Sequence, residues 1–443
     1  MNNSHSDREL SYKQSELLYG IYKPRWITPF LASAIKEHPI VVLTGARQVG
    51  KSTLLMNEPL FSEWKYLSFD DFNLLAQAKA EPTSLWIDAD KIILDEVQKA
   101  PQILSAIKQT VDRGRLKKRF ILSGSANLLL MHKIGESLAG RAVYFSLLPM
   151  TLGEMRGFLR PDILLNLFKG KFPKSQVLDN TPSQPHSFMH KGFMPALLSL
   201  TTKEGYLRWW EGYIATYLER DLRQLSQIES LPEFRRVMEA VALRSGQLVN
   251  QTEIARDVGI SQSTVYRYLN MLETTCLLRR IPAYAKSRTK RLIKSPKVYF
   301  IDPGLASFLC GYFEESSLKS AKESGSIFES MMLLHLTVLC ELLTPKAKIY
   351  YWRTVGGKEV DFVLEYGKRL IAVEVKLSTS PNYRDTEGIK SFLEEYSETS
   401  IGIIIHTGNE VKYLSQKILA MPWIMFTGMI QTVSLAPSTS FEF

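Results

Sequence analysis

Short hydrophobic runs recur along the first third of the chain, separated by longer polar stretches with room for helices. Strands of a parallel sheet that is covered on both faces are apolar throughout, so they appear as continuous hydrophobic runs. We therefore expect an α/β domain built on a parallel sheet. Its predicted strands are residues 40–43, 65–70, 91–96, 119–125 and 142–145.

The middle of the chain has the spacing of a helix-turn-helix. Residues 252–258 form an amphipathic pattern, Gly259 permits a turn, and Ser261 can cap a second helix over residues 262–273. Winged helices of this kind contact nucleic acid or serve as protein–protein modules inside ATPases, so both roles stay open. The polar positions that could face a groove are Gln262, Ser263, Tyr266, Arg267 and Asn270.

The last third predicts a second α/β domain, because a helix led by residues 328–330 precedes three strand-like runs. These runs are residues 349–353, 359–364 and 370–377, followed by a helix at 388–396 and a strand at 401–405. The expected organisation is a flexible tail (1–20), the parallel-sheet domain (21–155), a helical linker (156–235) with an inserted loop (169–190), a winged-helix domain (236–308) and the C-terminal domain (325–443).

The first predicted strand leads into a phosphate-binding loop with the pattern G-x-x-x-x-G-K-[ST]. The two glycines let the backbone N–H groups face phosphate oxygens, the lysine adds a positive charge, and the serine offers a hydroxyl to Mg²⁺. We therefore expect a bound nucleoside triphosphate, ATP, with Mg²⁺. The residues expected to contact it are Gly45, Ala46, Arg47, Gln48, Val49, Gly50, Lys51, Ser52 and Thr53.

Two adjacent carboxylates, Asp95 and Glu96, end the strand predicted at residues 91–96. The C-terminal ends of parallel strands meet bound phosphate at one edge of the sheet. There Asp95 would hold Mg²⁺, and Glu96 would orient and deprotonate the attacking water.

This arrangement, with a further strand and a glutamate base, resembles the AAA-like branch of phosphate-loop ATPases. The resemblance implies a polar sensor of the γ-phosphate after the strand at 119–125, which would be Ser125 or Asn127. It also implies a role for Arg141, which could reach a phosphate in its own subunit or a neighbouring one. An ordinary surface arginine is the alternative.

Asp361 and the sequence Glu374-Val375-Lys376 lie on neighbouring predicted strands of the C-terminal domain. Residues two apart in a strand point to the same face, so Glu374 and Lys376 project together and can meet Asp361. The order of elements resembles the PD-(D/E)xK nuclease core. Asp361 and Glu374, with Glu329 from the preceding helix, would then bind Mg²⁺, and Lys376 would position water or stabilise the leaving charge.

The 443 residues carry a formal net charge of +10, which indicates an anionic partner such as DNA. The densest basic tract, residues 286–297, follows the helix-turn-helix, where it could contact phosphates or form a solvated face. Three widely separated cysteines predict neither a disulfide framework nor a metal site. With no apolar run long enough to span a membrane and no hydrophobic leader, we expect a cytoplasmic protein.

Most of the chain resembles prokaryotic AAA-like ATPases (AAA+ or STAND-related) joined to a C-terminal domain of unknown function with winged-helix and nuclease-like parts. The expected function is a Mg²⁺-dependent ATPase whose nucleotide state moves these parts, with DNA as partner and a homo-oligomer left open. The rival hypothesis is an ATP-gated switch whose nuclease-like domain docks protein or DNA without cleaving it. The matching segments are residues 45–55, 93–101, 120–125, 137–141, 217–223, 294–304, 351–361 and 373–376.

Overall fold

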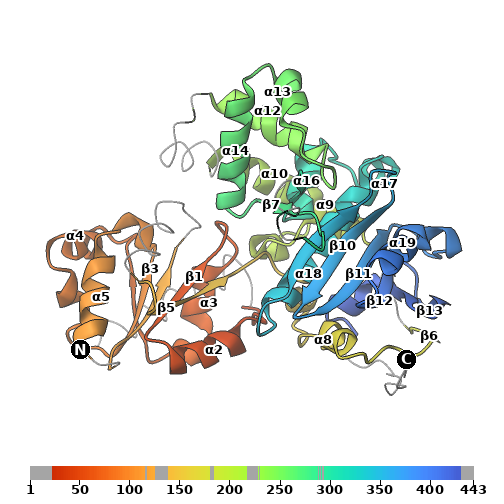
Figure 1. Ribbon diagram of the computed structural model, residues 1–443. Helices are drawn as coiled ribbons and strands as arrows, with labels where there is room; N and C mark the ends of the chain where they lie inside the picture. Colours follow the sequence, from red (N-terminus) through yellow and green to blue (C-terminus); the bar gives the residue numbers. More distant parts are fainter. Residues whose placement is uncertain are drawn as a thin grey trace.

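The computed structural model has an α/β domain, a helical middle region and a second α/β domain, which occupy different parts of the molecule (Figure 1). The winged helix lies at the top of this view, between the N-terminal domain at the left and the C-terminal domain at the right. The residues that the structure describes are 22–114, 117–124, 138–179, 184–216, 228, 230–287, 289, 291 and 294–430.

The N-terminal domain contains the predicted parallel sheet, with the strand order β2-β3-β4-β1-β5. All neighbouring strands in it run parallel. The loops that follow β1 and β3 therefore share one edge, and β4 separates these two strands. The strands are β1 (Ile40–Thr44), β2 (Lys65–Ser68), β3 (Lys91–Asp95), β4 (Arg119–Ser123) and β5 (Ala142–Ser146).

Helices cover both faces of this sheet, which explains why its central strands are apolar throughout. Alternate residues of β1 face opposite cores: Val41 and Leu43 join one hydrophobic cluster, and Ile40 and Val42 join the other. The covering elements are α2 (Thr28–Glu37), α3 (Lys51–Asn57), η1 (Pro59–Phe61), α4 (Phe72–Ala80), η2 (Pro82–Trp86), η3 (Val97–Lys99) and α5 (Ile103–Gly114).

The region between the two sheets is mostly helical, as predicted. The loop expected at residues 169–190 differs from that prediction, because it contains β6 and the start of α9. β6 pairs with β13 (Glu410–Ser415) at the edge of the C-terminal sheet, so a distant strand supplies the hydrogen bonds that order this segment. The elements are α7 (Leu152–Arg156), α8 (Ile163–Phe168), β6 (Gln176–Val177), α9 (His186–Lys191), η4 (Pro195–Ser199) and α10 (Lys203–Tyr213).

The helix-turn-helix prediction is confirmed. Asn250 caps α13, Gly259 ends it in the left-handed conformation at φ 77°, and Ser261 caps α14. A two-stranded antiparallel hairpin, β7–β8, forms the wing. The elements are α12 (Leu231–Ala242), α13 (Gln251–Val258), α14 (Gln262–Thr274), β7 (Leu278–Ile281), β8 (Lys297–Phe300), α16 (Pro303–Leu309) and α17 (Glu315–Ser320).

The C-terminal domain is a mixed seven-stranded sheet with the order β6-β13-β14-β12-β11-β10-β9. Its helix α18 joins the large hydrophobic cluster shared with the N-terminal domain, whereas α19 packs in a separate cluster. The elements are α18 (Ser324–Glu341), β9 (Lys348–Arg353), β10 (Glu359–Tyr366), β11 (Arg369–Lys376), η6 (Tyr383–Thr386), α19 (Glu387–Glu395), β12 (Thr399–His406), β13 (Glu410–Ser415), β14 (Ile418–Pro422) and η7 (Trp423–Phe426).

Among the helices of the described residues, none combines the length and the apolar character that crossing a bilayer requires.

Candidate functional site

The loop after β1 has the backbone of a phosphate-binding loop. Gly45, Gln48 and Gly50 all have positive φ values, of 152°, 60° and 91°. A Cβ atom at Gly45 would lie 2.3 Å from the carbonyl oxygen of Leu147, so only glycine fits there. The sequence pattern therefore reflects a physical constraint on this turn.

Lys51 begins α3 and is buried under the loop, with 6% of its surface exposed. Its Nζ donates to the main-chain carbonyl oxygens of Gly45 and Ala46 at 3.1 and 2.8 Å. Burial lowers the pKa of this ammonium, against the opposing effect of the Glu96 and Asp95 carboxylates. The positive charge has no ion pair within the described residues, which suits an incoming anion.

Asp95 ends β3 and is fully buried beside the phosphate-binding loop. The Tyr66 hydroxyl donates to its Oδ2 at 2.6 Å, and the Glu96 N–H donates to its Oδ1 at 3.0 Å. Burial, and then the Asp95 charge, raises the pKa of Tyr66, so the phenol remains a donor. Tyr66 orients the carboxylate that was predicted to hold Mg²⁺, and the sequence analysis missed it.

Glu96 follows in the left-handed conformation, with φ of 56°. Such backbone strain in a non-glycine residue concentrates at functional sites. Its Oε2 accepts a hydrogen bond from Gln98. Burial, followed by the charge of Asp95, raises the pKa of the Glu96 carboxyl, which makes its ionised form a stronger base.

The predicted sensor residues Ser125 and Asn127 lie outside the described residues. Ser123, the last residue of β4, stands beside Leu43 in the register of the sheet. Its Oγ is buried and has no hydrogen-bond partner within the described residues. Had the sequence analysis ended this strand at Ser123 rather than at residue 125, Ser123 would have been a candidate for the phosphate sensor.

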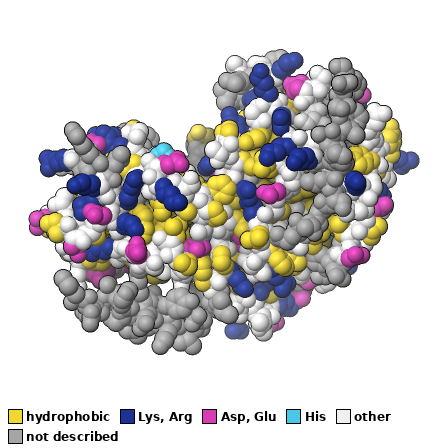
Figure 2. Space-filling view, turned by 90° about the horizontal axis from the view of Figure 1, so that it is seen from below, with side chains coloured by type: hydrophobic (Ala, Val, Ile, Leu, Met, Phe, Trp, Pro, Cys, Tyr) yellow, Lys and Arg dark blue, Asp and Glu magenta, His cyan; other side chains and the backbone are white. Residues whose placement is uncertain are grey.

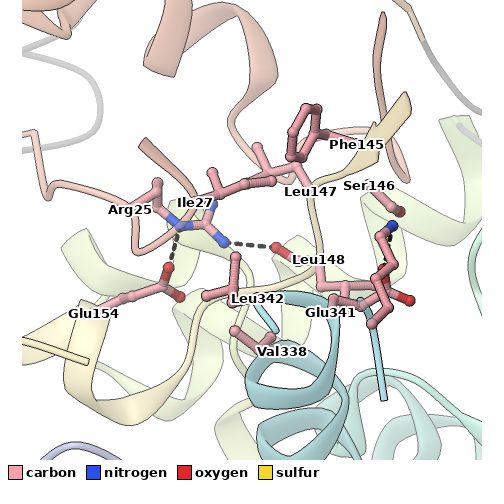
Figure 3. A pocket seen from close by; sticks show the side chains of 11 residues that line it. Arg25, Ile27, Phe145, Ser146, Leu147, Leu148, Glu154, Val338, Glu341 and Leu342 are labelled. Atoms are coloured by element: carbon pink, nitrogen blue, oxygen red, sulfur yellow. Dashed lines mark hydrogen bonds and ion pairs between the residues drawn. The ribbon is translucent and has the colours of Figure 1, made fainter. Parts of the chain in front are cut away.

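Arg25 supports the phosphate-binding loop from outside it, because its guanidinium donates to the carbonyl oxygen of Val49 at 2.9 Å. The guanidinium also donates to the carbonyl oxygen of Leu148 at 2.7 Å and ion-pairs with Glu154 at 3.2 Å (Figure 3). Val338, from α18 of the C-terminal domain, lines the same small pocket. Arg25 therefore links the phosphate-binding loop to the residues that follow β5, and it lies against the C-terminal domain.

A cavity of about 540 Å³ opens over the phosphate-binding loop. This volume is within the range of small-molecule and cofactor sites, roughly 300–1,000 Å³. Part of its wall comes from the middle region, so two parts of the chain enclose it. The lining residues include Gln48, Lys51, Ser52, Thr53 and Glu96 from the N-terminal domain, and Pro195, Ala196, Leu198 and Trp209 from η4 and α10.

Arg141 lies at the other edge of the sheet. It precedes Ala142, which pairs with Ile40 at the start of β1, whereas the phosphate-binding loop follows the end of that strand. Five strand residues separate the two edges by roughly 15 Å at about 3.3 Å per residue. Arg141 makes a bidentate ion pair with Asp112 at 2.6 and 3.0 Å. In this structure it does not reach the site of its own chain, and a role in a neighbouring subunit stays a prediction.

The groups around the cavity fit ATP and Mg²⁺. The cradle at Gly45 has no room for a side chain, and within the described residues Lys51 is buried without a carboxylate partner. Ser52 and Asp95 would offer oxygen ligands to the metal ion. Mg²⁺ in such sites uses few protein ligands and retains water and phosphate oxygens. The residues of the phosphate-binding loop would hold ATP, and Ser52 and Asp95 would hold Mg²⁺.

The C-terminal constellation also comes together as the strand spacing predicted. Asp361 Oδ2 accepts from the N–H of Val375 at 2.9 Å, and Lys376 Nζ ion-pairs with Glu374 at 2.7 Å. Burial and then the Asp361 charge raise the pKa of Glu374 to about 8, and the same causes raise that of Glu329. Glu329, from α18, thus faces the same centre.

A residue missed by the sequence analysis enters this centre. Lys297 of the wing strand β8 is 2% exposed, lies 3.4 Å from Asp361 Oδ1 and ion-pairs with Glu359. Across the described ranges, no three His, Cys, Asp or Glu side chains are arranged to hold a metal ion. The carboxylates predicted as metal ligands are instead neighbours of an ammonium group.

Part of the basic tract at 286–297 is used inside the protein. Arg291 pairs with Glu365 and lies over the rings of Tyr284 and Tyr350, with its Cζ 4.2 and 4.8 Å from their centroids. Lys297 is buried as described above. Lys286 and Lys294 are exposed, whereas Arg288 and Lys290 lie outside the described residues. The tract therefore joins the wing to the C-terminal domain, which its charge alone did not predict.

The outer face of α14 remains open. Gln262, Ser263 and Tyr266 are exposed, the tyrosine by 53%. Asn270 is partly buried and accepts a hydrogen bond from Arg280 at 2.6 Å, and the Arg267 guanidinium lies over the Tyr268 ring. Three of the five predicted groove-facing positions are thus exposed.

Comparison with protein families finds three matching segments of the chain. Residues 37–156 match the family described as AAA domain. Residues 184–316 match "Domain of unknown function (DUF8612)", and residues 324–426 match "Domain of unknown function (DUF4143)". The first match contains the phosphate-binding loop, the second contains the winged helix, and the third contains the carboxylate centre.

An uncharacterized protein of Mycobacterium tuberculosis is 28% identical and covers 96% of this chain and 90% of its own length. An uncharacterized protein of Haemophilus influenzae is 23% identical, with coverages of 87% and 94%. Among solved structures, a Walker-type ATPase of Pyrococcus abyssi matches 66% of this chain and 96% of its own, with 16% identity and a TM-score of 0.43. The chain therefore carries an AAA-type P-loop ATPase domain followed by two domains of unknown function.

Proposed function

We propose that this chain is a Mg²⁺-dependent ATPase whose nucleotide state is transmitted to its winged helix. The observation that carries the proposal is the shared cavity, in which Lys51 and Glu96 of the ATPase domain face a wall that includes Trp209 of the middle region. A nucleotide that fills this cavity would contact both parts, so its binding and loss would bias their arrangement.

The chemistry assigned to the ATPase domain follows from its charges. Lys51 exchanges the carbonyl oxygens of Gly45 and Ala46 for phosphate oxygens, which as anions are stronger acceptors. Glu96 orients and deprotonates the attacking water, helped by its raised pKa. Ser52 and Asp95 would hold Mg²⁺, which would supply positive charge to the phosphates. Arg141 acts, if at all, on the site of a neighbouring subunit.

Transmission to the winged helix rests on close contacts around the loop. The Tyr213 hydroxyl donates to the carbonyl oxygen of Arg47 at 3.5 Å. Burial raises the pKa of the Cys276 thiol, just beyond α14, and the nearby charge of Lys51 opposes that rise. Phosphate binding at Lys51 would thus change the electrostatic environment at the end of the helix that is proposed to contact DNA.

DNA is the proposed partner because α14 exposes polar side chains, and the chain has a net charge of +10. The charge is not gathered on the face drawn in Figure 2, where lysine and arginine side chains are interspersed with acidic and hydrophobic ones. On the described part of this face, DNA contact through a broad basic surface is therefore not favoured.

ATP hydrolysis measured with and without single-stranded, duplex and branched DNA, at two salt concentrations, tests this function. The proposal predicts stimulation that declines as salt rises, because phosphate contacts release counterions. A matched protein with Tyr266→Ala and Gln262→Ala should keep basal hydrolysis and lose the stimulation. Hydrolysis that no DNA form changes would refute DNA as the partner.

A second candidate function is an ATP-gated switch with slow turnover and a non-cleaving C-terminal domain. The use of Arg291 and Lys297 in ion pairs inside the protein favours it, because these charges are then withheld from DNA. The switch predicts an oligomeric mass that changes between ATP and ADP in light scattering. A mass that stays constant, together with DNA-stimulated turnover, favours the enzyme.

A further inference from the structure

The carboxylate centre of the C-terminal domain already contains a positive charge supplied by another domain. Lys297 lies in β8, 64 residues before Asp361, and its side chain is only 3% exposed. Its Nζ ion-pairs with the carboxylates of Glu359 and Asp361. Two opposite charges at this distance stabilise the charged form of the lysine inside the centre.

A second contact from the same strand repeats this arrangement. Tyr299, two residues further along β8, donates its hydroxyl hydrogen to Glu329 Oε2 at 3.1 Å. Residues two apart in a strand face the same side, so β8 presents a matched pair of donors to the carboxylates. A chance surface ion pair would not bury both donors, yet Tyr299 is fully buried and Lys297 nearly so.

The presence of this ammonium conflicts with a divalent metal ion in the same centre. Mg²⁺ needs oxygen ligands at about 2.0–2.1 Å in octahedral geometry, and a neighbouring ammonium would repel it. The described residues also lack a group of three acidic or His or Cys side chains arranged for a metal. The residues therefore do not fit the metal that the nuclease resemblance implied.

The carboxylate centre is not closed off from ions in solution. A cavity of about 400 Å³ opens beside the centre, lined by Gly246, Asn250, Lys297, Arg353 and Glu359. Ions from solution can reach Glu359 through it. The position is closed to them because Lys297 occupies it.

We propose that the carboxylate centre is an intramolecular receptor for Lys297, which docks the winged helix on the C-terminal domain and keeps divalent metal ions out. Metal binding and docking of the wing are then mutually exclusive. The C-terminal domain acts as a docking module while β8 is seated, and its centre is exposed when the wing departs. This inference does not depend on ATP hydrolysis.

The test is Mn²⁺ binding to the full-length chain without nucleotide, measured by the loss of the free Mn²⁺ electron paramagnetic resonance signal. The wild-type protein should bind no Mn²⁺ at a site that requires Asp361, so Asp361→Asn should leave its titration unchanged. Lys297→Met should add one site per chain, and Lys297→Met with Asp361→Asn should lose that site again. Lys294→Met, which changes an exposed lysine of the same tract, should behave as wild type.

Two results would overturn the proposal. One is Mn²⁺ binding by the wild-type protein that Asp361→Asn abolishes, because the centre would then hold metal with the wing seated. The other is a folded Lys297→Met protein that gains no site. If Lys297→Met does not fold without metal, recovery of its cooperative unfolding on adding Mn²⁺ supports the proposal. If it does not recover, the comparison of Mn²⁺ binding by the wild type and by Asp361→Asn decides.

Discussion

Two buried lysines, Lys51 in the phosphate-binding loop and Lys297 in the wing, have opposite environments. Lys51 bonds to two main-chain carbonyl oxygens, and burial lowers its pKa. Burial lowers the pKa of Lys297 too, but the adjoining carboxylates raise it by more. The ammonium group of Lys51 is therefore suited to binding a ligand anion, whereas the ammonium group of Lys297 is already neutralised by carboxylates of the protein.

The difference teaches how to separate a ligand site from a structural one when both contain lysine and carboxylates. Near Lys51, the carboxylates of Asp95 and Glu96 shift its pKa without ion-pairing with it, and a cavity of about 540 Å³ lies above it. Near Lys297 the carboxylates are direct partners. A buried charge whose partner is missing is costly, so only the first centre gains stability by binding an anion.

The largest expected effect is the loss of ATP binding in Lys51→Ala. Charged hydrogen bonds to the phosphates would be lost, so affinity should fall by roughly 100-fold or more. Isothermal titration of ATP with Mg²⁺ measures it, with Lys91→Ala, an exposed lysine paired with Glu63, as the control. Unchanged affinity in Lys51→Ala would remove the basis of the comparison.

The next effect is the loss of hydrolysis in Glu96→Gln with ATP binding retained. General-base catalysis accounts for roughly 10²–10⁴-fold in rate, so kcat should fall by that factor. Because burial and Asp95 raise the pKa of Glu96, the wild-type rate should fall with decreasing pH at a higher pH than an ordinary carboxyl would give. Exposed Glu63→Gln serves as control, and normal turnover in Glu96→Gln would show that another group is the base.

A smaller effect is expected from Trp209, which lines the cavity and stacks on Tyr213 at 5.1 Å between ring centroids. Trp209→Ala should weaken ATP binding about fivefold to tenfold, because an aromatic contact with the nucleotide is lost. Trp209→Phe should restore most of the affinity. If both variants bind ATP as wild type does, the middle region does not contact the nucleotide.

A further effect, on stability rather than on binding or rate, concerns the contact between α7 and α18, where His335 of α18 accepts a hydrogen bond from the Leu152 N–H at 3.1 Å. Burial lowers the pKa of this histidine to about 4. Because an unfolded histidine binds its proton near pH 6.5, its contribution to stability is complete above that pH and is lost as pH falls from 6.5 to 4, by about 1.4 kcal/mol per pH unit. Denaturant unfolding at a series of pH values measures this. The free energy of unfolding of His335→Gln should depend less steeply on pH than that of wild type or His38→Gln, and an equal slope would show that His335 does not cause the pH dependence.

Local sequence patterns predicted much of the fold, because strands, caps and the phosphate-binding loop depend on neighbouring residues. The apolar run at 40–43 became β1, and Gly259 ends α13 as expected. The prediction that Asp361 meets Glu374 and Lys376 also needed only strand geometry. The roles of these site residues stay predictions.

Contacts between distant segments could not be predicted in this way. Lys297 and Arg291 were expected in a basic tract that either contacts phosphates or forms a solvated face, yet their partners lie 64 and 74 residues further along the chain. Arg25 and Leu148 are separated by 123 residues. Whether a charged tract faces solvent or another domain is decided by docking, which leaves no periodic signal in the sequence.

The most direct test of the central claim counts divalent ions bound to the wild-type chain with and without nucleotide. Equilibrium dialysis against Mn²⁺, with and without a slowly hydrolysed ATP analogue, gives both numbers. The account predicts one Mn²⁺ per chain with the analogue and none without it, because only the Lys51 centre lacks its counter-charge. Mn²⁺ bound without nucleotide, and lost on Glu374→Gln, would show that the Lys297 centre is also an open site and would contradict the account.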